Sequence, residues 1–181
     1  MRLDKCTTKF QSAISDAQSL ALGRDHQYIE PEHIATALLN QQGGSVRTIL
    51  QQTGINLNTL RSGLAQALEK LPRVKGASGD VQFSRDTIAC FNLTDKIAQQ
   101  HNDQFISSEL FLLAALETKS RFADLLVSVG VTKKALQTAI DNVRAGQNVN
   151  DPNAEDVREA LEKYTSDLTE RAEQGKLDPV I

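Results

Sequence analysis

An internal repeat is the feature of this sequence that most restricts its fold. Residues 26–33 read HQYIEPEH and align with residues 103–110, which read DQFISSEL, at an offset of 77 residues. Upstream, the same offset aligns the apolar positions of residues 10–21 with positions of residues 87–98, and both sets recur with the i, i+3, i+4, i+7 spacing of a buried helix face. The repeat predicts two copies of one helical unit.

Start and stop signals divide each unit into four helices. Pro31 stands at the first turn of one expected helix, and Gly54 and Gly130 align as helix C-caps at an offset of 76 residues. The expected helices span residues 8–23, 31–41, 45–53 and 57–71 in the first unit, and 84–101, 108–118, 121–128 and 132–144 in the second. Because a single four-helix unit has a small core, we expect the two units to pack together. The predicted fold is all-α, a pseudo-twofold duplicated four-helix repeat of about eight helices, followed by a linker and one further helix.

Glycine, asparagine and proline residues after the repeat indicate a boundary. We predict a domain over residues 1–146, with repeats at about 6–71 and 83–146, and a linker over 147–153. A further helical pattern follows, and the chain then stops at an apolar Pro-Val-Ile without a turn signal, which is the pattern expected of a piece of a longer protein.

Composition excludes several classes of function. The formal net charge is −3 and the pI about 5.6, so there is no overall basic field for a nucleic acid. Cys6 and Cys90 lack zinc-site spacing, and the chain holds no apolar run of the roughly 20 residues that span a bilayer. We predict a cytoplasmic protein that binds neither nucleic acid nor membrane.

The sequence also lacks the patterns of an active site. Gly175 and Lys176 are followed by leucine where a phosphate-binding loop needs serine or threonine, so no nucleotide site is predicted here. The three histidines, His26, His33 and His101, have no metal-binding spacing. We expect no catalytic residue, cofactor or metal in this chain.

Several segments together resemble a known family. They are MRLD at 1–4, KFQ at 9–11, DAQSLALG at 16–23, IEP at 29–31, GGS at 43–45, FISSEL at 105–110 and the run from 161 to 181. They resemble the N-terminal region of the ClpB family of AAA+ disaggregases, which carries a double Clp repeat. The N domains of the ClpA and ClpC types share the repeat but match these segments more loosely.

The resemblance implies a role within a larger machine. The parent would be a cytoplasmic homohexamer of the heat-shock and stress response that uses ATP and Mg²⁺ to thread aggregated polypeptides through its pore, together with the DnaK system. Residues 154–181 would begin its first AAA+ nucleotide-binding domain. This chain would be monomeric, would not be an enzyme by itself, and would capture unfolded or aggregated polypeptides. Positions linked to chaperone activity in the family match Thr7, Asp103 and Glu109. A structural role competes for them, because Thr7 is placed as a helix cap and Glu109 lies in a first helical turn.

Comparison of the two repeats adds a second set of candidate residues. Four polar positions of the first unit are apolar in the second: Gln11, Asp16, His33 and Thr36 become Ile88, Leu93, Leu110 and Leu113. We predict that Leu93 and Leu110, with Ile88 and Leu113 beside them, form an exposed apolar groove for unfolded segments. The alternative is that some of them seal the contact between the units.

The predicted function is therefore recognition of exposed apolar segments by a module of a disaggregating chaperone. An adaptor-docking N domain of a Clp protease unfoldase, of the ClpA or ClpC type, is the alternative. A helical scaffold without a dedicated ligand is the third possibility.

Overall fold

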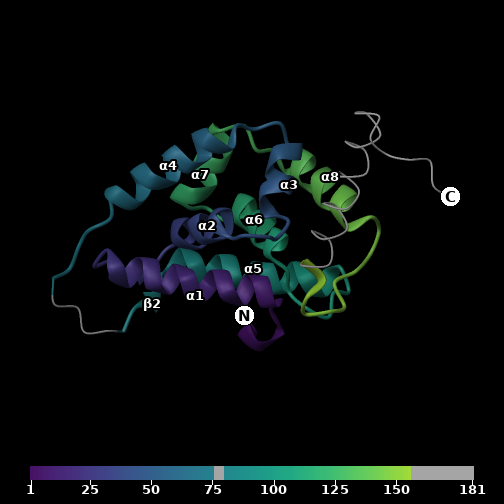
Figure 1. Ribbon diagram of the computed structural model, residues 1–181, viewed down its shortest axis with the longest axis horizontal. Coiled ribbons are helices and arrows are strands. Elements are labelled where there is room, and N and C mark those ends of the chain that lie inside the picture. The colour runs from purple at the N-terminus through teal and green to yellow at the C-terminus, as the bar shows by residue number, and fades with distance from the viewer. Residues whose placement is uncertain (76–79, 156–181) are drawn as a thin grey trace, which may run out of the picture.

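The computed structural model describes residues 1–75 and 80–155, and these form a helical domain (Figure 1). Its elements are η1 (Leu3–Lys5), α1 (Thr8–Gly23), β1 (Tyr28–Ile29), α2 (Pro31–Asn40), α3 (Val46–Gln52), α4 (Leu57–Glu69), β2 (Gln82–Phe83), α5 (Arg85–Gln100), α6 (Ser108–Glu117), α7 (Arg121–Ser128) and α8 (Lys133–Arg144). Each expected helix of the two units is present, with ends within two residues of those predicted. The further helix predicted after the linker falls on residues outside the described ranges from 156 onward.

Two helices occupy the centre of the domain. Figure 1 shows α2 and α6 in the middle, with α1 and α5 on one side and α4 and α7 on the other. In α6 all eight residues from Ser108 to Ala115 are buried, because the helix is apolar on every face and needs neighbours all round. At 10 residues α6 is short, and no helix among the described residues is both long and apolar enough to cross a membrane.

A cluster of aromatic rings joins the two units. Phe111 of α6 lies at the centre of it, with its ring centroid 5.9 Å from that of Phe10, 6.0 Å from Phe91 and 6.2 Å from Phe122. Phe10 belongs to the first unit and the other three to the second. The duplicated units therefore share one continuous hydrophobic core.

Short parallel strand pairs link the units in a crossed arrangement. Ile29 of β1 pairs with Phe83 of β2, and Cys6 forms a parallel bridge with Ile106. The repeat offset of 77 maps Cys6 onto Phe83 and Ile29 onto Ile106. The residue before the N-cap of the first helix of each unit thus pairs with the residue before the N-cap of the second helix of the other unit. The repeat pattern did not predict this exchange, which brings the N-termini of helices from different units together.

The predicted helix ends at Gly54 and Gly130 are confirmed, and each glycine directly follows the C-cap residue, Thr53 of α3 and Val129 of α7. Gly54 has φ +88° and Gly130 has φ +103°, backbone conformations that favour glycine. Thr7 is the N-cap of α1, and its side chain accepts a hydrogen bond from the backbone N–H of Phe10 at 3.3 Å.

Candidate functional site

Polar side chains from distant parts of the sequence meet inside the domain, beside the N-termini of α1 and α6. None of these side chains is more than 6% exposed. Buried polar groups are costly unless they are paired, so such a cluster needs mutual partners. We call this cluster the polar seam, and its members are Thr7, Asp103, Ser107, Ser108, Glu109, Arg144 and Glu155.

Arg144, the last residue of α8, is the cation of the polar seam. Its Nε donates to Glu109 Oε1 at 3.0 Å, its Nη1 donates to both carboxylate oxygens of Asp103 at 3.1 and 2.9 Å, and its Nη2 donates to Ser107 Oγ at 2.9 Å. Burial alone lowers the pKa of Arg144, but the carboxylates of Glu109 and Asp103 raise it above its usual value. The guanidinium therefore stays charged and holds two acids at once.

Glu155 is the acceptor on the other side of the polar seam. Its Oε1 accepts hydrogen bonds from Thr7 Oγ1 at 2.5 Å, from the backbone N–H of Ser108 at 2.9 Å and from Ser108 Oγ at 3.1 Å. Thr7 is the N-cap of α1 and Ser108 is the first residue of α6. One carboxylate thus serves two helix N-termini, where the helix dipoles favour a negative charge.

The segment that carries Glu155 lies against the domain. Val149 is 2% exposed; its backbone N–H donates to Asp103 Oδ1 at 3.0 Å, and its carbonyl oxygen accepts from Gln104 and Phe105 at 2.9 and 3.1 Å. The carbonyl oxygen of Pro152 accepts from the backbone N–H of Thr8 at 2.8 Å. The described residues of the predicted linker are therefore bonded to both units, while the domain boundaries themselves stay a prediction.

Comparison with known proteins places this arrangement in a family. A sequence model of the Clp repeat (R) N-terminal domain matches residues 5–129. The chain belongs to the Clp repeat N-terminal domain family. Among its relatives are the chaperone protein ClpB of Vibrio cholerae, 58% identical over all 181 residues, and that of Pseudomonas putida, 57% identical over the same length. The chain spans about a fifth of these relatives, 21% of each, and the resemblance to the N-terminal region of the ClpB family is confirmed.

Solved structures show the same Clp repeat fold. The Hsp104 N-terminal domain from Candida albicans superposes with a TM-score of 0.75 at 20% identity, over 83% of this chain and 99% of that one. A ClpV N-domain solved in complex with a VipB peptide has a TM-score of 0.64 at 20% identity, over 77% of this chain and 86% of that one. At such identities the likeness concerns the fold, and it confirms the all-α prediction.

Three residues singled out from the family resemblance meet in the polar seam. Thr7 is both the cap of α1 and a partner of Glu155, and Asp103 and Glu109 are both partners of Arg144. Sequence reasoning missed Ser107, Ser108, Arg144 and Glu155. A signal for Arg144 was present, because it continues the buried spacing of Leu136 and Ile140 along α8, where a charge is out of place.

The predicted exposed groove is wrong for two of its four residues. Leu110 and Leu113 are 0% and 4% exposed, because α6 is enclosed on all sides. Of the other two, both on α5, Ile88 is 47% exposed and Leu93 is partly buried against the core. At about 100° per residue they lie on opposite flanks of the helix, so they do not line one groove. Contact of Ile88 and Leu93 with substrate stays a prediction.

The first unit has a buried acid at the position of Glu109, but it has no arginine at the position of Arg144. Glu32 aligns with Glu109, but the position aligned with Arg144 is Leu68. Glu32 is 2% exposed, and burial, followed by the nearby charge of Glu30, raises its pKa to about 7. Because this lies above the usual 4.5, the protonated carboxyl stabilises the fold fully below pH 4.5, and that contribution is lost as the pH rises through about 7.

Replacement of Glu32 should therefore change how stability depends on pH. We expect Glu32→Gln to match the parent chain near pH 4 and to be more stable at pH 8, by on the order of 1–3 kcal/mol, since glutamine cannot ionise. Urea unfolding of both chains at the two pH values measures the difference. Glu69→Gln is the control, because the Glu69 side chain is 68% exposed. An equal difference between Glu32→Gln and the parent chain at both pH values would contradict the prediction.

Proposed function

We propose that this chain is the substrate-recognition module of an ATP-dependent chaperone that disaggregates and helps refold stress-damaged proteins with the DnaK system in the cytoplasm. The observation that supports it is the 57–58% identity with ClpB chaperones, which extends over all 181 residues. ATP, Mg²⁺ and assembly into a hexamer belong in this proposal to the remainder of the parent protein. The chain itself binds unfolded or aggregated polypeptides and catalyses no reaction.

The surface of the domain suits weak, sequence-tolerant binding. Large apolar side chains on it are individually 39–63% exposed: Leu3, Leu22, Tyr28, Val74, Ile88 and Val127. Single exposed side chains give small increments of apolar burial, and a Kd near micromolar requires only about 8 kcal/mol. The ClpV N-domain solved with a VipB peptide supports peptide binding by this fold. Weak binding suits a module that must release its substrate to the rest of the machine.

In this proposal the polar seam fixes the segment that leaves the domain. Glu155 and Val149 hold the outgoing segment against the N-termini of α1 and α6. A substrate bound to the domain is then held in a fixed position relative to residues 149–155. The family resemblance links Thr7, Asp103 and Glu109 to chaperone activity, and in this proposal they act through the seam: Thr7 bonds to Glu155, Asp103 bonds to Val149, and Glu109 bonds to Arg144, which also holds Asp103.

Binding of an unfolded model protein tests the proposed function. We expect reduced, carboxymethylated α-lactalbumin to bind the 181-residue chain with a Kd in the micromolar range and native α-lactalbumin not to bind, as measured by calorimetry or NMR titration. Ile88→Ser should weaken binding without loss of stability, because the side chain is half exposed. Ala89→Ser, in the same turn and also exposed, is the control. Equal binding of the native and unfolded forms, or of neither, would overturn the proposal.

A further inference from the structure

A small pocket lies between α2 and α4 of the first unit, away from the polar seam. Its volume is about 170 Å³, and Leu39, Leu64 and Leu68, each 2% exposed, form its apolar floor. Its rim is polar and contains Arg24, Thr36, Asn40 and Arg61. An apolar floor with a few placed polar groups is the usual composition of a ligand site. We call it the arginine-rimmed pocket.

The repeat explains why this space is open in the first unit. Thr36 aligns with Leu113 of the second unit, which is 4% exposed in the core. Thr36 is shorter, and its hydroxyl turns back to donate to the backbone oxygen of Glu32 at 2.7 Å. The first unit therefore keeps room for one aliphatic side chain where the second unit has its own leucine.

The rim carries positive charge in a fixed position. Arg61 donates from Nη1 to Asn40 Oδ1 at 2.9 Å and from Nη2 to the backbone oxygen of Leu39 at 2.7 Å. Both acceptors are neutral, so these bonds orient the guanidinium without neutralising it. Arg24 is 3.7 Å from Glu69, whose side chain is 68% exposed, and such a pair is weak.

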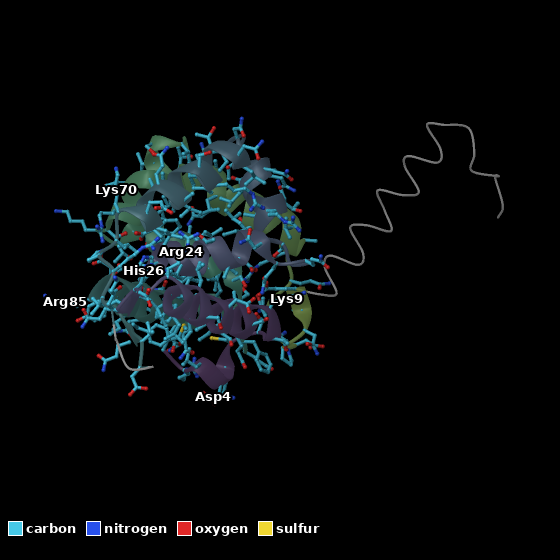
Figure 2. All side chains as sticks on the ribbon, turned by 60° about the vertical axis from the view of Figure 1, so that its left-hand side comes forward. Asp4, Lys9, Arg24, His26, Lys70 and Arg85 are labelled. Carbon is cyan, nitrogen blue, oxygen red and sulfur yellow. The ribbon has the colours of Figure 1, made fainter. Side chains whose placement is uncertain are left out.

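Further basic side chains lie on the same side of the domain. Figure 2 shows Arg24, Lys70 and Arg85 there, with Arg24 beside His26. The guanidinium groups of Arg61 and Arg24 on the rim therefore favour an anionic partner over a cationic one, and the exposed Glu69 beside Arg24 weakens this preference only in part.

We propose that the arginine-rimmed pocket binds an extended polypeptide segment in which an aliphatic residue is followed by an acidic one. The aliphatic side chain occupies the apolar floor, and the carboxylate accepts hydrogen bonds from Arg61 and Arg24. This proposal rests on the proposed function and gives its substrates a preference, since a purely apolar segment leaves the rim unused. Carboxylate–guanidinium hydrogen bonds are among the strong ones, and they add geometric specificity.

Short unstructured peptides test this preference. The probes are fluorescein-labelled glycine–serine decapeptides with a central Leu-Asp, Leu-Lys or Ala-Asp pair. We expect the Leu-Asp peptide to bind the 181-residue chain roughly tenfold or more tightly than either of the others, and added salt to weaken it. Thr36→Leu fills the pocket as in the second unit and should weaken Leu-Asp binding by a similar factor. Thr59→Leu, at an exposed position of α4, is the control.

Arg61→Gln provides a second variant that does not change the apolar floor. It should reduce the advantage of Leu-Asp over Leu-Lys even if Thr36→Leu disturbs folding. Equal affinity of the chain for the Leu-Asp and Leu-Lys peptides would overturn the proposed role of the arginine-rimmed pocket. So would an unchanged affinity of the Arg61→Gln chain for the Leu-Asp peptide. If carboxymethylated α-lactalbumin binds while none of the peptides does, the proposed recognition of unfolded polypeptides is supported and the proposed role of the pocket is wrong. If neither the unfolded protein nor the peptides bind, the proposed function fails as well.

Discussion

Replacement of Arg144 by methionine should destabilise the domain by about 3–5 kcal/mol. The substitution keeps the apolar stem but removes the guanidinium that binds Glu109, Asp103 and Ser107. Both acids have side chains that are 0% exposed, so they are left charged in a medium that solvates them poorly. Equilibrium urea unfolding at pH 7 measures the loss of free energy.

Two further variants distinguish the loss of this buried ion pair from the effect of replacing any arginine. Arg47→Met is the control, because Arg47 is exposed and is held by one hydrogen bond to the backbone oxygen of Gln41; we expect a change of about 0.5 kcal/mol or less. Addition of Asp103→Asn and Glu109→Gln to Arg144→Met should recover part of the loss, because no buried carboxylate then lacks its cation. A loss from Arg144→Met no larger than from Arg47→Met contradicts the charge pairing described here.

Replacement of Glu155 by alanine should cost about 2–4 kcal/mol and release the segment that precedes it. Three donors from Thr7 and Ser108 lose their carboxylate, and hydrogen bonds to a charged acceptor contribute about 1.5–3 kcal/mol each, with incomplete additivity. The backbone bonds of Val149 should then open more often. Amide hydrogen exchange should show faster exchange at Val149, Gln104 and Phe105, which take part in those bonds.

A matched acid lies in the same segment. Asp151 is exposed, and its Oδ1 accepts from the backbone N–H of Asn153 at 2.8 Å. Asp151→Ala should therefore leave stability within about 0.5 kcal/mol and leave exchange at Val149 unchanged. Similar effects of the two substitutions would show that Glu155 does not hold the segment. The Glu155→Ala chain should still bind unfolded α-lactalbumin, since the exposed apolar side chains are not altered.

Arg144→Met and Glu155→Ala both test how the helical domain is attached to the segment of residues 149–155. The polar seam joins the start of α1, the start of α6 and the end of α8 to residues 149–155. If the proposed function holds, Glu155→Ala in the full-length parent should impair disaggregation more than it impairs substrate binding. That separation is expected because the side chains of the seam are buried, whereas the apolar side chains proposed to bind substrate are exposed.

The helices and the duplication followed from local patterns in the sequence. Apolar spacing, a proline at the start of α2 and glycines with positive φ after α3 and α7 act within a few residues of each other, so their effect does not depend on the rest of the chain.

The contacts of the polar seam, and the burial or exposure of the four apolar candidate residues, depended on tertiary packing. Arg144 is 35 residues from Glu109, and Glu155 is 47 residues from Ser108, so they meet only because α8 packs against α6 and residues 149–155 fold back onto the domain. The change from His33 to Leu110 and from Thr36 to Leu113 identified positions that differ between the units, but helical spacing cannot say which side of an all-apolar helix is covered. Neighbouring elements bury α6 on every face from Ser108 to Ala115, whereas in the first unit a pocket lies open at Thr36, which aligns with Leu113. Periodicity is a property of one helix, whereas exposure is a property of everything packed around it.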